Sequence, residues 1–178
     1  MDRKMELTRV YKKLAEAQFF LRKLTEQERQ MIGDMEPFDY YLSAFLNAGR
    51  TVDWRLHREQ RVIYPTWRKT WDANLTPQED SLIKFMVNDR NVEVHESGSS
   101  RSVAHESVEF RAGTHRVEGG FIDVVDGFGP PGMPSAVLSK PTYHSFTIDG
   151  AERKATEACA DYLALLQKMV KEFDAAHP

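Results

Sequence analysis

Apolar residues recur every three or four positions along three stretches of the chain, a spacing typical of amphipathic helices. The first stretch ends near Gly33, and Glu28 is the single polar residue that interrupts its apolar face. That face carries Leu7, Val10, Leu14, Ala17, Leu21, Leu24 and Met31. We therefore expect a long first helix with one buried side and a solvated side of mixed charge.

The second stretch predicts a helix from about Pro37 to about Arg61, followed by a short helix from Tyr64 to Trp71. The apolar side of the long helix carries Phe38, Leu42, Phe45, Gly49, Val52 and Leu56. A glycine inside a helix costs about 1 kcal/mol relative to alanine. Gly49 therefore indicates close packing against a neighbouring element.

A third helix has a well-defined start. Thr76, Pro77 and Glu79 supply a hydroxyl N-cap, a proline at the first helical position and a glutamate three residues after the cap. The helix should continue through Arg90 and end near Glu96, because a glycine-serine turn follows.

The last helix is the third of the periodic stretches, and Asp149-Gly150 is expected to open it. Its apolar residues repeat at spacings of four and three, at Ala155, Cys159, Tyr162, Leu166, Met169 and Phe173. Cys159 lies on this face, which favours a small core residue over a nucleophile.

Residues 101–148 differ from the rest of the chain. Val103–Arg111 alternates apolar and polar side chains like a strand, and Val117–Val125 resembles a second strand with a bend at its glycines. Ser135–Leu138 and Tyr143–Ile148 could add two short strands. We expect a small antiparallel β-meander that packs on the helices, since an isolated sheet of this size is unstable.

Together these patterns predict one mainly α domain of α+β character over residues 1–178. Residues 3–98 and 150–176 would form a four-helix bundle, with the β region 101–148 inserted between the third and fourth helices. The 41% hydrophobic and 29% charged content is that of a soluble globular protein. One cysteine excludes an intramolecular disulfide and a cysteine-rich metal site.

The N-terminus is charged, and no apolar run approaches the roughly 18 residues that a membrane helix needs. We therefore expect a cytoplasmic protein without a membrane partner. Because the net charge is −3, any contact with a nucleic acid must come from a local patch or from a surface created by oligomerisation.

One such patch lies between residues 50 and 69, where six cations accompany only two carboxylates. Aromatic residues are interleaved with these cations, a combination that can hold a phosphate backbone and stack bases. The candidate nucleic-acid-binding residues are Arg50, Arg55, Arg58, Arg61, Arg68, Trp54 and Trp67. The alternative is a surface helix whose tryptophans cap the core.

The segment RNVEVH, at the end of the third helix, carries the residue types that phosphodiester cleavage needs. RNA supplies its own nucleophile, so a ribonuclease needs a proton-transfer group and positive charge on the phosphoryl oxygens. His95 and Arg90 can supply these without a metal or other cofactor. Five helical positions place them about 140° apart, whereas Asn91 and His95 share a face. The alternative is a helix-end histidine that solvates the last carbonyls.

The other histidines suggest a metal hypothesis. His95, His105, His115 and His144 could gather with Asp123 around zinc. Their spacing matches no compact ligand motif, and alternating strands would scatter them over both faces, so we predict no metal site. His57, in the basic second helix, could contact phosphate.

The order of helices, with an Arg, a polar residue and a His near the end of the third, resembles the HEPN superfamily. Arg90, Asn91 and His95 match its hallmark, an Arg followed by four to six residues and a His. The resemblance covers roughly residues 3–98 and 150–176 and leaves the inserted β region unexplained. A toxin subgroup has a tyrosine two residues after the histidine. Ser97 stands there in this chain, which argues against that form of regulation.

The resemblance implies a homodimer whose two motifs meet in one cleft, with metal-independent endoribonuclease activity. It also implies a toxin–antitoxin or defence role, with RNA as substrate and an antitoxin or other protein as partner. Arg90 and His95 would then be catalytic, with Asn91 orienting. Other members of the superfamily are non-catalytic binding modules, and this remains the alternative function. The helix end, with Glu93 and Glu96 beside His95, should favour protonated His95 and suits phosphate binding or acid catalysis.

Overall fold

The computed structural model describes residues 3–29, 36–95, 101–110, 113–117, 120–124 and 136–177, with side chains at 7–29, 37–89, 101–102 and 144–177. Within these ranges the helices are α1 (Arg3–Glu28), α2 (Glu36–Glu59), α3 (Tyr64–Ala73), α4 (Pro77–His95) and α5 (Ala155–Ala176). The strands are β1 (Ser102–Phe110), β2 (Gly113–Val117), β3 (Gly120–Val124), β4 (Ala136–Ile148) and β5 (Ala151–Lys154). The prediction of a mainly helical protein with antiparallel strands before the last helix is confirmed.

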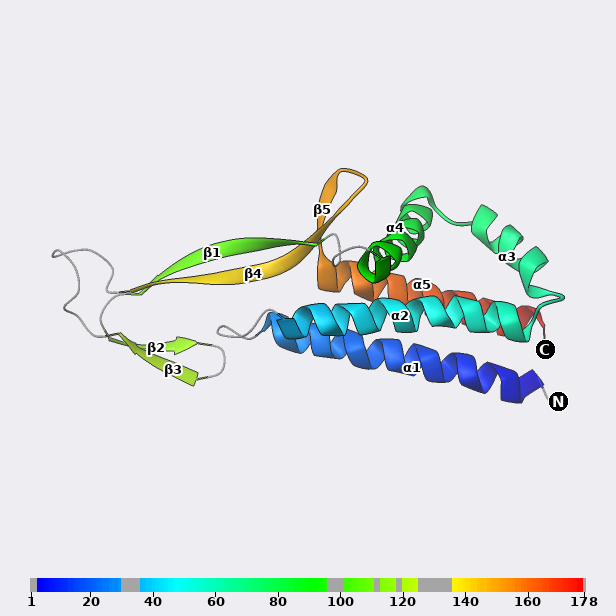
Figure 1. Cartoon of the computed structure of the whole chain (residues 1–178), viewed down its shortest axis with the longest axis horizontal. Helices are drawn as coiled ribbons and strands as arrows, with labels where there is room; N and C mark the ends of the chain where they lie inside the picture. The colour runs from blue at the N-terminus through cyan, green and yellow to red at the C-terminus, as the bar shows by residue number, and fades with distance from the viewer. Residues whose placement is uncertain are drawn as a thin grey trace.

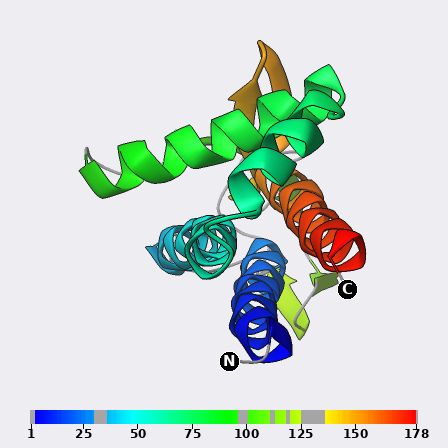
Figure 2. The same cartoon turned by 90° about the vertical axis from the view of Figure 1, so that its right-hand side faces the viewer.

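Three long helices run alongside one another, and the fourth long helix crosses them. Figure 1 shows α1, α2 and α5 stacked lengthwise, with α4 seen nearly end-on. Figure 2, turned by 90°, shows α4 along its length above α2 and α5. The C-terminal end of α4 extends past α2 in this view. The short helix α3 connects the far end of α2 to the start of α4 (Figure 1).

The core lies between the apolar faces of these helices. On α1 the predicted positions Leu7, Val10, Leu14, Ala17 and Leu24 are buried, and Leu21 packs partly buried against them. Met31 lies outside the described residues. Every predicted apolar position of α2 and of α5 is buried, including Cys159. Because burying a large aliphatic or aromatic side chain contributes about 1.5–3 kcal/mol, these faces are the main source of stability.

Gly49 brings α2 close to α5. A Cβ atom at this position would lie 2.8 Å from Cε1 of Tyr162, a distance that real Cβ contacts do not reach. Tyr162 is 3% exposed and meets Phe45 edge to face, so its ring has little room to move. The predicted close packing at this glycine is confirmed.

Glu28, the polar residue in the apolar face of α1, holds the start of α5. The hydroxyl of Thr156 donates to its carboxylate at 2.8 Å, and Lys154 Nζ lies 3.1 Å from the same oxygen. The Glu28 side chain is only 5% exposed. A carboxylate at a helix N-terminus is also favoured by the helix dipole, so the interruption of the pattern marks a contact between distant elements.

The strands form two antiparallel sheets, β1-β4-β5 and β2-β3, rather than one meander. The expected strand Val117–Val125 is confirmed only in part: β3 covers Gly120–Val124, whereas Val117 ends β2 and pairs with Gly120 of the antiparallel partner strand. Two short strands were expected where β4 runs continuously from Ala136 to Ile148. Pro141, inside β4, is tolerated because it pairs at the register shift of β1, where the regular ladder is interrupted.

Asp149-Gly150 does not open the last helix, as its sequence suggested. The two residues form the turn of the hairpin β4–β5, and both have positive φ, 52° for Asp149 and 76° for Gly150. An Asp-Gly pair is the favoured sequence for such a two-residue hairpin turn. The chain then forms β5 before α5 begins at Ala155.

Candidate functional site

The Arg90–His95 segment forms the last turns of α4, and the backbone is helical up to His95. The predicted extent of this helix is therefore confirmed. Its predicted capping box is confirmed too: the backbone NH of Glu79 donates to Thr76 Oγ1, and the Thr76 NH donates to Glu79 Oε2. The side chains of Arg90, Asn91 and His95 lie outside the described set, so their convergence stays a prediction.

The residues just before this segment fix the helix to the core. Leu82, Met86 and Asp89 follow one another at spacings of four and three, and all three are buried. Asp89 is 1% exposed and directly precedes Arg90. Burial, then the charges of Asp89 and Glu28, raise the pKa of the Cys159 thiol, which keeps the thiol protonated. The burial of Asp89 was not predicted from the sequence, although its spacing from Met86 was visible.

A hollow of about 560 Å³ lies at the junction of α2 and α3, and three of the predicted nucleic-acid-binding residues line it: Arg50, Trp54 and Arg68. Its lining does not include Arg55, Arg58, Arg61 or Trp67. Its walls include Arg50, Trp54 and His57 from α2 and Arg68 and Lys69 from α3. The structure thus brings part of the predicted set together on one surface.

Arg68 belongs to a network under this hollow. Its Nη1 lies 2.6 Å from Asp53 Oδ1, and its Nε lies 2.7 Å from Asp72. The Tyr64 hydroxyl donates to the same Asp53 oxygen, and Arg50 Nη1 lies 3.1 Å from the other. Burial opposes the charge of Arg68, but Asp53 raises the pKa of the guanidinium above its usual value. Burial and Asp53 raise the pKa of Tyr64 as well, so Tyr64 stays a hydrogen-bond donor.

Trp67 is also part of the packing. Its ring stacks on Tyr64 and Trp71 and meets Phe173 edge to face. The alternative interpretation, tryptophans that cap the core, therefore describes Trp67 and Trp71.

Trp54 differs from these tryptophans. It is 47% exposed, and the guanidinium carbons of Arg55 and Arg58 lie 5.7 and 5.1 Å from its ring centroid. Arg55 also pairs with Glu59 at 3.5 Å. Arg58, Arg61 and Lys69 are exposed. Among the predicted aromatic residues, Trp54 is therefore the one that a ligand can reach.

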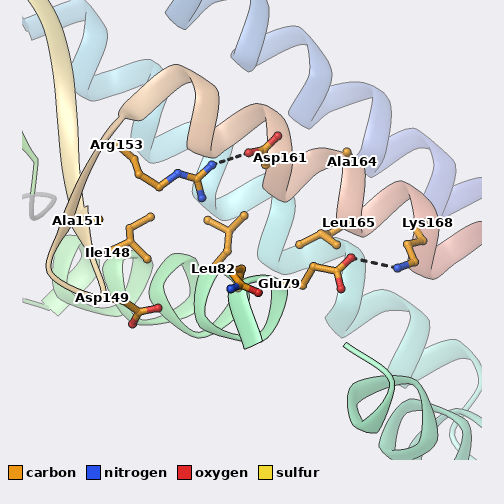
Figure 3. Close-up of a pocket in the computed structure, with 11 residues that line it drawn as sticks. Glu79, Leu82, Ile148, Asp149, Ala151, Arg153, Asp161, Ala164, Leu165 and Lys168 are labelled. Atoms are coloured by element: carbon orange, nitrogen blue, oxygen red, sulfur yellow. Dashed lines mark hydrogen bonds and ion pairs between the residues drawn. The ribbon is translucent and has the colours of Figure 1, made fainter. Parts of the chain in front are cut away.

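A larger hollow, of about 680 Å³, separates α4 from α5 beside the β4–β5 hairpin (Figure 3). Leu82, Ile148 and Leu165 form apolar walls. Four of its charged lining residues form two ion pairs: Lys168 contacts Glu79 at 3.1 Å, and Arg153 contacts Asp161. The sequence did not predict this hollow, because the Asp149-Gly150 turn that builds its hairpin side was interpreted as a helix start.

His144 lies at the base of the β1–β4 ribbon, where it contacts α2. Its ring stacks on Phe38 with a centroid distance of 3.6 Å, and its Nδ1 accepts a bond from Arg101 Nη1 at 3.0 Å. Arg101 also pairs with both oxygens of Asp39. Burial and the neighbouring Arg101 lower the pKa of His144 to about 4. His144 therefore fastens the ribbon to the helices.

Within the described ranges, no three His, Cys, Asp or Glu side chains lie together in a way that could hold a metal ion. The side chains of His95, His105, His115 and Asp123 are outside those ranges. Likewise, no helix in the part of the chain that the structure describes has the length and apolar content needed to cross a membrane.

Compared with protein-family models, with curated proteins and with solved structures, the chain matches none of them.

Proposed function

We propose that the protein is a metal-independent endoribonuclease of the HEPN type, with Arg90 and His95 as catalytic residues and Asn91 as the residue that orients His95. The observation that carries the proposal is the position of the Arg-Asn-x3-His segment in the last turns of α4, immediately after the buried Asp89. Buried residues hold this helix, so its end has a fixed direction. In the proposed correspondence, α1, α2, α4 and α5 are the four bundle helices, and α3 is the short helix between the second and third.

In the proposed reaction, the 2′-oxygen of RNA loses its proton and attacks the adjacent phosphorus. The bond from phosphorus to the 5′-oxygen breaks, giving a 2′,3′-cyclic phosphate and a 5′-hydroxyl. Arg90 neutralises the phosphoryl oxygens, and a protonated His95 donates a proton to the leaving 5′-oxygen. An unprotonated His95 from a second copy accepts the proton of the 2′-hydroxyl.

A homodimer is part of this proposal, because acid and base then come from two copies of one motif. The path of α4 is compatible with it: the C-terminal end of α4 extends past α2 (Figure 2), where a second copy can approach. In a toxin or defence role, an antitoxin or other protein would cover this end of α4.

The test is cleavage of a labelled single-stranded RNA by the purified protein. His95→Ala and Arg90→Ala should each abolish cleavage while the far-ultraviolet circular dichroism spectrum stays that of the parent. His177→Ala and Arg22→Ala, away from the motif, should cleave like the parent. Cleavage by either motif variant at the parent's rate, or cleavage that EDTA stops, would refute the mechanism.

The second candidate function is a non-catalytic binding module for a protein or nucleotide partner. It is favoured by the β1–β4 ribbon, which extends away from the ends of the helices and offers a surface for a partner (Figure 1). A stable stoichiometric partner in a pull-down, together with no RNA turnover, would support this function over the first.

A further inference from the structure

We infer that the hollow between α2 and α3, together with Arg58 beside Trp54, is a binding site for single-stranded RNA, in which a base stacks on Trp54 and the adjoining phosphates contact Arg58 and Lys69. The inference rests on the proposed function for its choice of ligand, but it concerns a different surface and can be tested without cleavage.

The charge around the hollow favours a polyanionic ligand. The segment from residue 50 to residue 69 carries six cations and two carboxylates, in a chain whose net charge is −3. Those two carboxylates, Asp53 and Glu59, each form an ion pair with an arginine of the same segment. Asp72, the other acid of the hollow, pairs with Arg68. The surface that remains for a ligand is therefore cationic, and a phosphate backbone is its electrostatic complement.

The exposure of Trp54 favours a ligand with an aromatic face. A large aromatic ring that is 47% exposed gains little from packing, yet it lines the hollow and attracts two guanidinium groups. Every base has a π-face, so such a ring binds single strands without a sequence requirement. A base that stacks on Trp54 displaces a guanidinium from the ring, and that guanidinium can then pair with the next phosphate.

Hydrogen bonds hold together the two helices that border the hollow. Asp53, Tyr64 and Arg68 join α2 to α3 through the hydrogen bonds under the hollow. The Nη1 of Arg68 also reaches the sulfur of Met169 on α5 at 3.1 Å. Trp54 and Lys69 therefore project from two helices whose relative position is fixed, so a ligand does not need to order the site when it binds.

Residues 50–69 thus fall into two groups. Arg68 and Trp67 build the support of the site, whereas Trp54, Arg58 and Lys69 contact the strand. An acidic peptide could pair with the cations, but its carboxylates would not stack on the Trp54 ring. In a stiff duplex the bases are paired and cannot stack on Trp54.

The experiment is fluorescence anisotropy with a 5′-fluorescein 12-nucleotide single strand made of 2′-O-methyl RNA, which has no 2′-hydroxyl and is not cleaved. We expect saturable binding that weakens with salt. Trp54→Ala should weaken it about tenfold, the size measured for loss of one stacked base. Trp54→Phe should restore most of the affinity. Lys69→Glu should weaken binding and flatten its salt dependence, whereas Lys12→Glu, an exposed cation of α1, should do neither.

Binding by Trp54→Ala and Lys69→Glu with the parent's affinity would overturn the inference. So would equal affinity for a blunt duplex or for polyglutamate, or the absence of saturable binding. The two proposals fail separately: a protein that binds the strand through Trp54 but never cleaves RNA refutes the ribonuclease alone. A protein that cleaves RNA equally well with Trp54→Ala and Lys69→Glu, and binds the probe unchanged, refutes this site alone.

Discussion

Arg101 Nη1 lies 3.0 Å from Nδ1 of His144, and this contact joins the residue before β1 to the strand that runs beside it. A guanidinium has only donors, so His144 Nδ1 must be the acceptor and the ring must be neutral. Protonation of His144 would replace this bond with two facing cations. Asp39, which pairs with Arg101, opposes that repulsion only in part.

We predict that the protein loses stability as the pH falls from about 6.5 to about 4. The pKa of His144 is about 4 in the folded protein and about 6.5 when the chain unfolds, so the unfolded state binds more protons in this window. Above about pH 6.5, His144 contributes its full share to the free energy of unfolding. Up to about 3 kcal/mol of that free energy is lost as the pH falls towards 4. Urea unfolding at several pH values measures it.

His144→Gln removes the titrating group and should flatten the stability profile between these pH values. His57→Gln, at an exposed position of α2, is the matched control and should leave the profile of the parent. Equal slopes for His144→Gln and the parent would mean that His144 does not fasten the ribbon as described.

Gly49→Ala is expected to destabilise the protein, although alanine is the better helix former. The gain in helix propensity is about 1 kcal/mol, but the new Cβ would lie 2.8 Å from the ring of Tyr162. Forcing an extra methyl into such a site costs about 1–3 kcal/mol, so the net change should be a loss of about 1 kcal/mol. Thermal unfolding measures this loss of stability. A melting temperature of Gly49→Ala above that of the parent would show that α2 and α5 can move apart at the contact between Gly49 and Tyr162.

Gly49 also shows what the sequence could predict. Helical faces follow from periodicity, which is why the buried sides of α1, α2 and α5 were predicted almost residue by residue. Asp149-Gly150 shows the limit: an aspartate followed by a glycine suits both a helix start and a hairpin turn, and only pairing of β4 with β5 decides between them. Local patterns do not contain such long-range pairing.

The candidate sites show the same limit. The cationic and aromatic composition of residues 50–69 was visible in the sequence, but Arg68 was not distinguishable from Arg58. Their difference arises from Asp53, fifteen residues before Arg68, and from Met169 on α5. The direction in which α4 crosses its neighbours likewise depends on packing between elements, which no single segment specifies.

Asp53→Ala should destabilise the protein by about 2 kcal/mol. The substitution removes the acceptor that Tyr64 and Arg68 share. The Arg68 side chain, which is only 18% exposed, then has fewer partners for its guanidinium. The expected loss lies between those of exposed and fully buried ion pairs. Asp161→Ala, which breaks an exposed pair with Arg153, is the control and should cost less than about 0.5 kcal/mol. Equal losses for the two variants in urea unfolding would contradict the supporting role of Asp53.

The Glu28 carboxylate should contribute more to stability than its neighbours on α1, because it joins the end of that helix to the start of α5. Glu28→Ala leaves the Thr156 hydroxyl without its acceptor and Lys154 without its ion pair, so we expect a loss of about 2 kcal/mol. Thr156→Val keeps the volume and should cost about 1 kcal/mol. Because the two side chains share one bond, the double variant should lose less stability than the sum of the two single losses, and a double-mutant cycle measures that coupling.

Glu26→Ala, which removes an exposed carboxylate two residues earlier, is the matched control. If Glu28→Ala were no more destabilising than Glu26→Ala, the polar interruption of the α1 face would have no role in holding α5.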